Sequence, residues 1–337
     1  MKALVYKGPK KVEVENIELN KKEDNFIKIK VKYCGVCGSD IGIYLGTHPR
    51  AKAPLVLGHE FLGIVQEDGK KFKKGDRVVA YPLISCGNCT PCREGNEHVC
   101  KTLGLIGIDV DGGIREEFYV NEDVLFKVPD KVSDKAASVI EPLAVIIRAI
   151  NQAKFRPRDK VAIIGAGPIG ILTGIAVKNF GAENVIISDV SEKRLKVAKE
   201  LGLTTVNVSE ENLNDVILDV TNGDGADVTF ECSGSESSAI EITQIAKISG
   251  TICMLSVHKQ AHKVDLRELN FKEQTIIGSR VYTKREFEKA VNYSEVIETE
   301  LEKVVTHIIP LSESEKVFDL IADTNNGTIK VLIDFSK

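Results

Sequence analysis

The sequence predicts an α/β protein of two domains, one β-rich and one built on a doubly wound parallel sheet. Short alternating apolar runs with few helical patterns fill residues 1–147. Within residues 148–283, short apolar runs instead alternate with helical patterns, as they do in βαβ units. The chain has 337 residues, which is enough for about two domains.

We expect the β-rich domain to be mainly antiparallel. Its apolar and polar residues alternate in short runs, and glycine, lysine and asparagine separate these runs. The tail, residues 284–337, reads as helices followed by a last strand at 330–334. The other expected strands lie at residues 3–6, 12–14, 26–33, 63–65, 77–80 and 117–120.

The strongest pattern of the second domain is the stretch VAIIGAGPIG at residues 161–170. It predicts a strand, a glycine turn and a helix. Gly165 allows a tight turn, Gly167 lets a phosphate approach the backbone, and Gly170 lets the helix pack closely on the strand. Pro168 and Ile169 open the helix, whose first N–H groups and positive dipole end favour an anion. The stretch therefore predicts a dinucleotide site.

An acidic residue after the next strand extends this pattern. Residues 185–187 form a second apolar run that leads to Asp189, nineteen residues beyond Gly170. A carboxylate there can accept hydrogen bonds from the ribose diol of NAD, and its charge would repel the 2′-phosphate of NADP. Arg194, in the following helix, is a further candidate for the cofactor site. NAD is therefore the expected cofactor.

Bulk composition argues against several classes of partner. The chain is 43% hydrophobic and 28% charged, and its net charge of −4 gives no reason to expect nucleic acid or an anionic membrane. No apolar run approaches the roughly 18 residues of a membrane span. The first residues also lack the apolar core of a signal peptide. We expect a cytoplasmic protein with no nucleic-acid and no membrane partner.

Six of the eight cysteines lie between Cys34 and Cys100, and in an unsecreted chain this clustering indicates metal or redox chemistry. Four of them follow the spacing C-x2-C-x2-C-x7-C: Cys86, Cys89, Cys92 and Cys100. Four thiolates so spaced can enclose a tetrahedral zinc ion, and a closed sulfur shell makes such a site structural. The alternatives are four unrelated thiols and an iron–sulfur cluster, although bacterial ferredoxin spacing continues with x3-C-P.

A second candidate metal site draws on distant loops. Cys37, His59, Glu60 and Glu141 could form an open shell, in which water or substrate takes the remaining position. Each of them also has an ordinary reading, such as a hydrogen-bonded histidine or a glutamate at a helix start. Cys34 with Cys37 would suit a thioredoxin-like pair only in a βαβ setting, and this region reads as all-β.

These motifs follow the order found in the zinc-containing medium-chain dehydrogenases, and the sequence resembles their polyol and sugar-acid branch. Sorbitol, threonine and gulonate-type dehydrogenases are similar. The resemblance implies a GroES-like catalytic domain of residues 1–147 with 284–337, and a Rossmann domain of residues 148–283. It rests on CGVCGSD (34–40), GHEFLGIV (58–65), KKGDRVV (73–79), the four-cysteine segment, DGGIREEF (111–118), IEPLAV (140–145) and VAIIGAGPIG.

The resemblance also implies two zinc ions per subunit and roles for individual residues. The four residues of the open shell would hold a catalytic zinc, with the two glutamates as exchangeable partners. Asp40 would orient His59, and Ser39 would relay the proton of the substrate. The zinc would lower the pKa of a secondary alcohol, whose hydride passes to NAD.

One position departs from these relatives. Many polyol and threonine enzymes carry a histidine two residues after the aspartate that matches Asp40, whereas this chain has Gly42. The usual histidine end of the proton path is therefore missing. This makes threonine a less expected substrate and leaves the exit path of the proton open.

Basic residues near the metal loop bear on the choice of substrate. The segment 46–60 most resembles the gulonate-type group, and His48 is a candidate substrate contact, although a histidine before proline is as often a plain turn residue. Arg50 and Lys52 add positive charge, so an anionic sugar acid or sugar phosphate competes with the reading of a solvated basic turn. Arg280 could meet such a substrate or form a salt bridge between domains or subunits.

The expected activity is reversible oxidation of a secondary alcohol of a polyol, sugar acid or sugar phosphate, with NAD. A short-chain diol or simple alcohol dehydrogenase is the alternative among enzymes. A non-catalytic NAD(H)-binding redox sensor is the alternative outside them, and the complete open shell argues against it. By resemblance we expect a homodimer or homotetramer, with a contact near Val281.

Overall fold

The computed structural model describes residues 1–323 and 326–336, and these fall into two compact units. Unit 1 contains residues 1–144, 282–323 and 330–336, so the first and last parts of the chain fold together. Unit 2 contains residues 145–281 and 326–329. The junctions at 144/145 and 281/282 lie three and two residues before the expected ones.

The tail does not belong wholly to unit 1, contrary to expectation. Residues 326–329 lie against helix α6 (Glu192–Glu200) of unit 2, where Nε of Arg194 donates to the carbonyl of Thr328 at 3.2 Å. Gly327 lies so close to Lys193 that a Cβ on the glycine would come within 3.0 Å of the lysine Cβ. Contacts with α6 therefore draw this part of the tail into unit 2.

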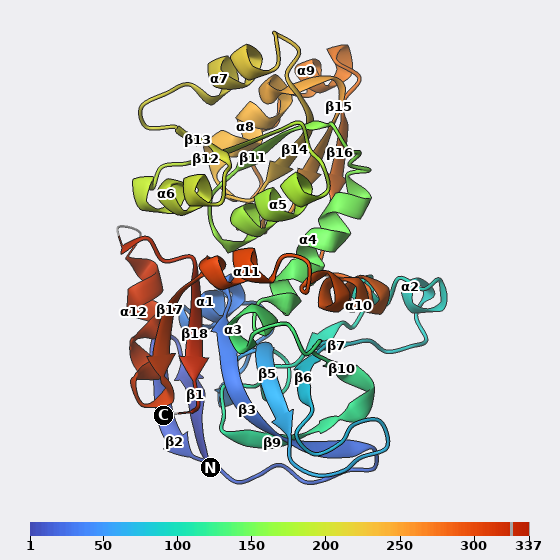
Figure 1. Cartoon of the computed structure of the whole chain (residues 1–337), viewed down its shortest axis with the longest axis vertical. Coiled ribbons are helices and arrows are strands. Elements are labelled where there is room, and N and C mark those ends of the chain that lie inside the picture. Colours follow the sequence, from blue (N-terminus) through green and yellow to red (C-terminus); the bar gives the residue numbers. More distant parts are fainter. Residues whose placement is uncertain (324–325, 337) are drawn as a thin grey trace. The chain divides into compact units, whose positions relative to one another are not determined.

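Unit 1 is built on a mixed sheet that pairs strands from both ends of the chain (Figure 1). The C-terminal strand runs antiparallel to β3, with Leu332 opposite Gly35. In the described residues the sheet has seven strands in the order β10-β6-β5-β3-β18-β17, and β9 also pairs with β3. Their bounds are β3 Phe26–Val36, β5 Glu60–Val65, β6 Arg77–Ala80, β9 Glu117–Asn121, β10 Leu125–Lys127, β17 Val305–Pro310 and β18 Lys330–Asp334.

Two smaller sheets complete the β-structure described in unit 1. One has the order β2-β1-β4, and the other pairs β7 with β8. Every strand expected in the first 147 residues falls within or overlaps an observed strand, so the β-rich prediction is confirmed. The bounds are β1 Lys2–Gly8, β2 Lys11–Asn16, β4 Leu55–Val56, β7 Leu83–Ile84 and β8 Gly104–Leu105.

Short helices lie in the loops between these strands and in the tail. The tail contains the expected helices and last strand, but β17 was not expected. It pairs in parallel with β18, and most of its side chains are half-buried, so its sequence shows no clear alternation. The helical bounds are α1 Gly38–Tyr44, α2 Thr90–Arg93, η1 Glu97–Val99, η2 Glu122–Val124, α3 Asp134–Ala137, α4 Ile140–Gln152, α10 Lys284–Tyr293, α11 Glu298–Val304, η3 Leu311–Lys316 and α12 Val317–Ala322.

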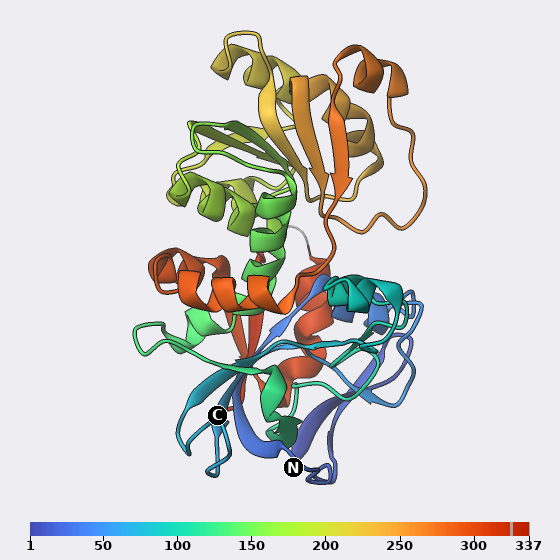
Figure 2. The ribbon, with the colours of Figure 1, turned by 90° about the vertical axis from the view of Figure 1, so that its right-hand side faces the viewer.

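Unit 2 is a parallel sheet with helices on both faces, as Figures 1 and 2 show. The strand order is β13-β12-β11-β14-β15-β16, so the direction of progression reverses between β11 and β14. Such sheets bind ligands beyond the carboxyl ends of the strands at the reversal. The predicted doubly wound sheet is confirmed. The strands are β11 Lys160–Ile164, β12 Asn184–Asp189, β13 Thr204–Asn207, β14 Ala226–Glu231, β15 Ala246–Met254 and β16 Thr275–Gly278.

Buried β-branched residues explain why these segments form central strands. Ile186, Val206 and Ile252 are each no more than 1% exposed and belong to one core cluster. Ile217 and Ile242 join the same cluster from helices α7 and α8. This rigid sheet fixes the positions of the loops at its carboxyl edge. The helices are α5 Pro168–Asn179, α6, α7 Leu213–Val220, α8 Glu236–Ile245 and α9 Leu266–Phe271.

Candidate active site

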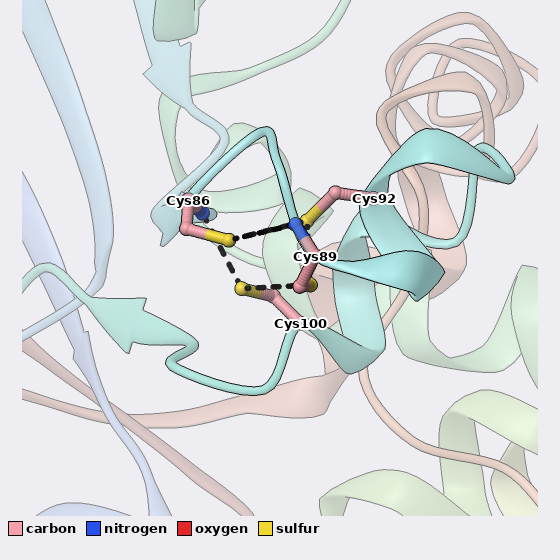
Figure 3. Close-up of side chains that lie close together, drawn as sticks. All are labelled: Cys86, Cys89, Cys92 and Cys100. Carbon is pink, nitrogen blue, oxygen red and sulfur yellow. Dashed lines mark hydrogen bonds between the residues drawn. The ribbon is translucent and has the colours of Figure 1, made fainter.

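The four cysteines of the closed motif converge on one point in unit 1 (Figure 3). Cys86 follows β7, Cys89 caps the start of α2, Cys92 lies within α2, and Cys100 follows η1. Their sulfurs all lie within 4.8 Å of one another. Cys89 Sγ is 3.4 Å from Cys92 Sγ and 3.8 Å from Cys100 Sγ.

These separations fit a zinc ion. Zn–S bonds of about 2.3 Å place tetrahedral sulfurs about 3.8 Å apart. Backbone N–H groups also donate to the sulfurs, from Cys86 to Cys100 Sγ at 3.3 Å and from Cys89 to Cys86 Sγ at 3.4 Å. The Cys86 N–H lowers the pKa of the Cys100 thiol to about 6, which favours the thiolate that zinc binds.

A second group of donors lies elsewhere in unit 1. Cys37 is the N-cap of α1, His59 precedes β5, and Glu60 is the first residue of β5. One donor atom of each lies within 4.8 Å of the other two. His59 and Glu60 are 4% and 2% exposed, so they face protein rather than bulk water. The structure brings together three of the four residues expected in the open shell.

Glu141, the fourth, lies in the first turn of α4 and outside this close group. Its Oε1 accepts a hydrogen bond from the hydroxyl of Tyr282, which is fully buried. Burial raises the pKa of Glu141 to about 7, and interaction with His59 opposes that shift. Glu141 therefore lies beside the donors and is held by a tyrosine that no motif had indicated.

Asp40 and Ser39 lie at the start of α1. Asp40 Oδ2 accepts a hydrogen bond from the Cys37 N–H at 2.8 Å, while Oδ1 lies 3.9 Å from Nδ1 of His59. That second distance is beyond hydrogen-bond range. The Ser39 hydroxyl is buried and has no hydrogen-bond partner in the described residues. A buried hydroxyl without a partner can accept or donate to a bound molecule.

Lys330 is a second residue that the sequence did not reveal. It is 2% exposed, and its Nζ lies 2.6 and 2.9 Å from the two carboxylate oxygens of Glu60. Gly35 leaves room for this carboxylate, because a Cβ there would lie 2.3 Å from Glu60 Oε2. The sequence gives only a weak signal for it, a lysine directly before the apolar run Val331–Ile333 of strand KVLID.

The charges of the open group fit a divalent cation. Cys37, Asp40, Glu60 and Glu141 lie in one region, with Lys330 paired to one of the carboxylates. Burial raises the pKa values of Asp40 and Glu141, which means that the surrounding protein compensates their negative charge only in part. A zinc ion would supply positive charge, and thiolate, imidazole and carboxylate are donors that zinc accepts.

The expected substrate residues have different surroundings. His48 follows α1 and accepts backbone hydrogen bonds at its Nδ1. The Arg50 guanidinium forms an ion pair with Asp109 at 3.2 Å and also donates to a backbone carbonyl. Arg280 follows β16, is exposed, and makes no hydrogen bond or ion pair with other described residues. The charge of Arg50 is therefore already engaged by the protein.

In unit 2 the three glycines after β11 have different reasons to be glycine. Gly165 has φ of +101°, and a Cβ there would lie 3.1 Å from the backbone of Ser233 after β14. A Cβ at Gly170 would lie 1.8 Å from the carbonyl oxygen of Gly165. Gly167, which precedes Pro168 at the start of α5, has nothing within 4 Å of its ideal Cβ. Two glycines serve packing, and the third leaves open space at a helix N-terminus.

Asp189, the last residue of β12, lies beside this turn. Its Oδ2 accepts a hydrogen bond from the Ala166 N–H at 2.7 Å, and its Oδ1 accepts one from the Ser191 N–H at 2.8 Å. The carboxylate is half-buried, so each oxygen can still accept a further hydrogen bond. Arg194 is held to the tail through Thr328. Ile169 continues the first turn of α5.

Glu231, the last residue of β14, also escaped the sequence reasoning. It is fully buried, and its Oε1 accepts hydrogen bonds from the N–H groups of Ser233 and Gly234, both at 2.9 Å. Its Oε2 accepts from the Ser256 hydroxyl and lies 3.2 Å from Nε2 of His258. Glu231 therefore ties the loops after β14 and β15 together at the ligand edge. The sequence did contain one signal for this residue, because Glu231 is an acidic residue inside the mostly apolar run VTFEC.

Across the described residues, none of the helices combines the length and apolarity needed to cross a bilayer.

Comparison with known proteins assigns the family. Residues 23–130 match the model of the alcohol dehydrogenase GroES-like domain, and residues 168–295 match that of the zinc-binding dehydrogenases. The 2-dehydro-3-deoxy-L-galactonate 5-dehydrogenase of Pseudoalteromonas atlantica is 33% identical over 312 residues, which cover 91% of each chain. The chain is a zinc-binding dehydrogenase.

Two further relatives show the breadth of this family. The L-threonine 3-dehydrogenase of Yersinia pestis is 33% identical over 314 residues, covering 90% of this chain and 91% of its own. The crystal structure of 2R,3R-butanediol dehydrogenase from Bacillus subtilis matches 99% of both chains at 31% identity, with a TM-score of 0.91. The resemblance inferred from the motifs is thus confirmed. This zinc-binding dehydrogenase is an NAD-dependent alcohol oxidoreductase, and its cofactors are zinc and NAD.

Proposed function

We propose that this zinc-binding dehydrogenase oxidises a secondary alcohol group of a polyol, sugar acid or sugar phosphate. The observation that carries the proposal is the buried donor group of Cys37, His59 and Glu60, beside Glu141 and the unpartnered hydroxyl of Ser39. A shell of one thiolate, one imidazole and a carboxylate leaves a coordination position for an alcohol oxygen.

We assign the catalytic zinc to Cys37 and His59, with Glu60 and Glu141 as exchangeable partners. When bound, the zinc supplies a Lewis acid that lowers the pKa of the alcohol, and NAD accepts the hydride. Each glutamate has an alternative partner in the protein, Lys330 for Glu60 and the Tyr282 hydroxyl for Glu141. Such partners would let one carboxylate leave the metal without becoming an unpaired buried charge.

Ser39 is proposed to accept the proton of the substrate hydroxyl and pass it towards solvent. Its hydroxyl is buried, lies at the start of α1, and has no competing hydrogen bond in the described residues. Asp40 supports this position, because its bond to the Cys37 N–H fixes the first turn of α1. A positioned hydroxyl of this kind speeds proton transfer.

For the second metal, we propose a structural zinc at the four-cysteine site. Its support is the sulfur spacing and the N–H groups that point at two of the sulfurs. The residues are Cys86, Cys89, Cys92 and Cys100.

The cofactor site is proposed to lie at the glycine turn of unit 2. The open space at Gly167 and the N–H groups of the first turn of α5, including Ile169, would receive the pyrophosphate. Asp189 would accept hydrogen bonds from the adenosine ribose and would repel a 2′-phosphate, while Arg194 would flank the adenosine. Comparison of kcat/KM with NAD and NADP tests this assignment, and a preference for NADP would contradict it.

The relatives differ in substrate while sharing the family. Those described above act on a sugar-acid derivative, on threonine and on butanediol, as their names state. A short-chain diol is therefore the second candidate, supported by the close structural match to the butanediol enzyme. Threonine is the least supported of the three, because Gly42 replaces the histidine of many threonine enzymes.

One substrate panel separates these candidates. NAD reduction is measured against sorbitol, galactitol 1-phosphate, gulonate, threonine and 2,3-butanediol, at matched protein and zinc concentrations. The proposal expects the highest kcat/KM with one of the first three. A clear preference for the diol would instead support the second candidate. Tight NADH binding without turnover of any alcohol would favour a redox sensor and contradict an enzymatic role for this site.

We also propose a homodimer or homotetramer in the cytoplasm. Strand β16 is an edge of the described sheet of unit 2, and Ile276 on it is 38% exposed, close in sequence to Val281. An exposed edge strand favours pairing with a second copy. The eight free cysteines suit a reducing compartment, in which thiolates remain available to zinc. Light scattering coupled to gel filtration tests the assembly, and a monomer would contradict it.

A further inference from the structure

Tyr282 connects the start of helix α10 to the carboxylate of Glu141. Its side chain is fully buried, and its hydroxyl donates a hydrogen bond to Glu141 Oε1. Glu141 itself lies outside the close group formed by Cys37, His59 and Glu60. The bond to Tyr282 therefore engages one of the two oxygens that Glu141 could offer to a metal in that group.

The position of the Tyr282 ring follows from the sequence at the start of α10. The next residue, Thr283, is the N-cap of the helix and forms a capping box with Glu286. The Glu286 carboxylate accepts from the Thr283 N–H at 2.9 Å, and the Thr283 hydroxyl accepts from the Glu286 N–H at 3.3 Å. Phe287 then packs against Tyr282 with ring centroids 5.6 Å apart. This arrangement is a hydrophobic staple, which fixes the direction in which a chain enters a helix.

Further aromatic rings pack around Tyr282. Tyr81 meets it edge-on, with ring centroids 5.8 Å apart and an interplanar angle of 66°. Phe287 also contacts Tyr81 at 5.9 Å and Phe126 at 5.0 Å. Tyr81 and Phe287 are 6% and 0% exposed, so these rings belong to the core of unit 1. Rings packed in this way leave little free space, and Tyr282 should therefore move only together with the start of α10.

The four-cysteine segment contacts the same helix start. Glu97 lies in η1, between Cys92 and Cys100, and its Oε1 accepts a hydrogen bond from the Lys284 N–H at 3.3 Å. Lys284 is the first residue of α10, so its N–H has no partner within the helix, and a carboxylate there also meets the positive end of the helix dipole. A zinc ion bound to both flanking cysteines would fix the turn that carries Glu97.

We propose that Tyr282 is a positioning residue that keeps Glu141 out of the shell of the catalytic metal, and that Glu97 fixes Tyr282 to the four-cysteine segment. This inference rests on the proposed function, because it concerns the same metal site. While Tyr282 holds Glu141, a coordination position stays open for the alcohol oxygen. In this role the closed cysteine site does more than stabilise its own segment, since it controls how readily the Glu141 carboxylate reaches the other metal.

The hydroxyl of Tyr282 can be removed without its ring. Tyr282→Phe retains the packing on Phe287 and releases Glu141. Tyr81→Phe is the matched control, because the Tyr81 hydroxyl is buried but makes no hydrogen bond in the described residues. Each protein is prepared with cobalt(II) at the catalytic site and zinc at the four cysteines. The visible absorption of cobalt(II) then reports the ligands and the geometry of the catalytic metal.

In Tyr282→Phe the cobalt absorption should change, because the released carboxylate joins the metal. Transfer of the cobalt to a chelator should slow about fivefold to tenfold, the effect of one competing hydrogen bond, while Tyr81→Phe should match the native protein in both measurements. Native absorption and exchange in Tyr282→Phe would overturn the proposal, and so would equal changes in the two variants. A native protein without a cobalt spectrum that Cys37→Ser abolishes would instead contradict the proposed function itself.

Substitutions at Glu97 test the link to the four-cysteine segment. Glu97→Ala should change the cobalt absorption in the same direction as Tyr282→Phe and by less, whereas Glu97→Gln keeps an acceptor oxygen and should restore most of the native spectrum. Glu94→Ala removes an exposed carboxylate from the same segment and should have no effect. Combining Glu97→Ala with Tyr282→Phe should give no more change than Tyr282→Phe alone, because both act on one contact. Full additivity, or a native spectrum in Glu97→Ala, would overturn this link.

Discussion

At the scale of single residues, the ion pair of Lys330 with Glu60 is a deeply buried electrostatic feature of unit 1. Both side chains are at most 2% exposed, and the lysine reaches both carboxylate oxygens. Removing the cation alone would leave a buried carboxylate without its partner. Lys330→Met should therefore lower the free energy of unfolding by about 3–5 kcal/mol, measured by urea denaturation at fixed zinc concentration.

An exposed pair supplies the control for this prediction. Lys22 and Glu67 also form a salt bridge, but their side chains are 52% and 35% exposed. Lys22→Met should leave the free energy of unfolding nearly unchanged, because water screens an exposed ion pair. In the double variant Lys330→Met with Glu60→Gln, much of the loss should be recovered, because no charge remains buried. A double variant that simply sums the two single effects would show that the pair is not coupled.

Residues such as Lys330 mark the limit of what the sequence could predict. The metal donors were recognisable because cysteines at fixed short spacing, and a histidine next to a glutamate, form local motifs. Lys330 and Glu60 are separated by 270 positions, and Tyr282 and Glu141 by 141. The first pairing arises because β18 and β5 both lie beside β3 in the sheet, and neither pairing leaves a local pattern in the sequence. The partners of the ligands therefore required the structure.

At the scale of elements, two glycines of the turn after β11 should have different roles, Gly170 in packing and Gly167 in cofactor binding. A Cβ at Gly170 would strike the Gly165 carbonyl, which the strand and helix hold in place. Gly170→Ala should therefore lower the stability of the fold by about 2–3 kcal/mol, the usual cost of overpacking. Thermal unfolding followed by circular dichroism measures this change.

Gly167→Ala is the matched variant, because nothing lies within 4 Å of its ideal Cβ. Its stability should change by no more than about 0.5 kcal/mol. The added methyl group would instead occupy the proposed pyrophosphate position, so the Kd for NADH should rise about tenfold or more in fluorescence titration. Weak NADH binding by a stable protein is the expected signature. Unchanged NADH affinity would place the pyrophosphate elsewhere.

Helix α3 gives a prediction about pH. Asp134, its first residue, forms ion pairs with Lys32 of β3 and Arg77 of β6. Burial raises the pKa of Asp134, but the hydrogen bonds from Lys32 and Arg77 outweigh it, and the net shift is downward. Because the pKa of Asp134 is lowered in the folded state, the carboxylate stabilises the fold fully at pH values above its unfolded pKa of about 3.9. This stabilisation is lost as the pH falls through the folded pKa.

Asp134→Asn removes this titration. The variant should be less stable than the native protein at pH 7, and the difference should shrink as the pH falls from about 5 towards 3. Urea denaturation at a series of pH values measures the difference. A gap that widens in acid would mean that Asp134 does not have a lowered pKa.

At the scale of the molecule, the order of motifs along the chain was enough to predict two domains and their classes. It was not enough to place residues 326–329, which leave unit 1 between α12 and β18 to contact α6. Motifs indicate which residues bind a ligand, whereas the path of a connecting segment depends on the surface residues that it contacts. Here Arg194 donates to the Thr328 carbonyl, and this contact fixes a side chain that is proposed for the cofactor site.

The two donor groups occupy separate segments of unit 1, so their metals should be separable. We expect two zinc ions per chain in the native protein, measured by elemental analysis. Cys37→Ser and Cys92→Ser should each retain about one. Cys37→Ser should lose turnover while its NADH affinity stays near the native value, because the glycine turn belongs to unit 2.

Cys92→Ser should lose the other zinc ion, the structural one, and this loss should loosen the segment that the four cysteines hold. The segment from Cys86 to Cys100 contains only one short helix and a single 3-10 turn, so little besides the metal would hold it. Limited proteolysis should therefore cut this segment in Cys92→Ser but not in Cys37→Ser, although both variants contain one zinc. Loss of both metals in either variant would show that the sites are coupled and would refute the separation of a catalytic from a structural zinc.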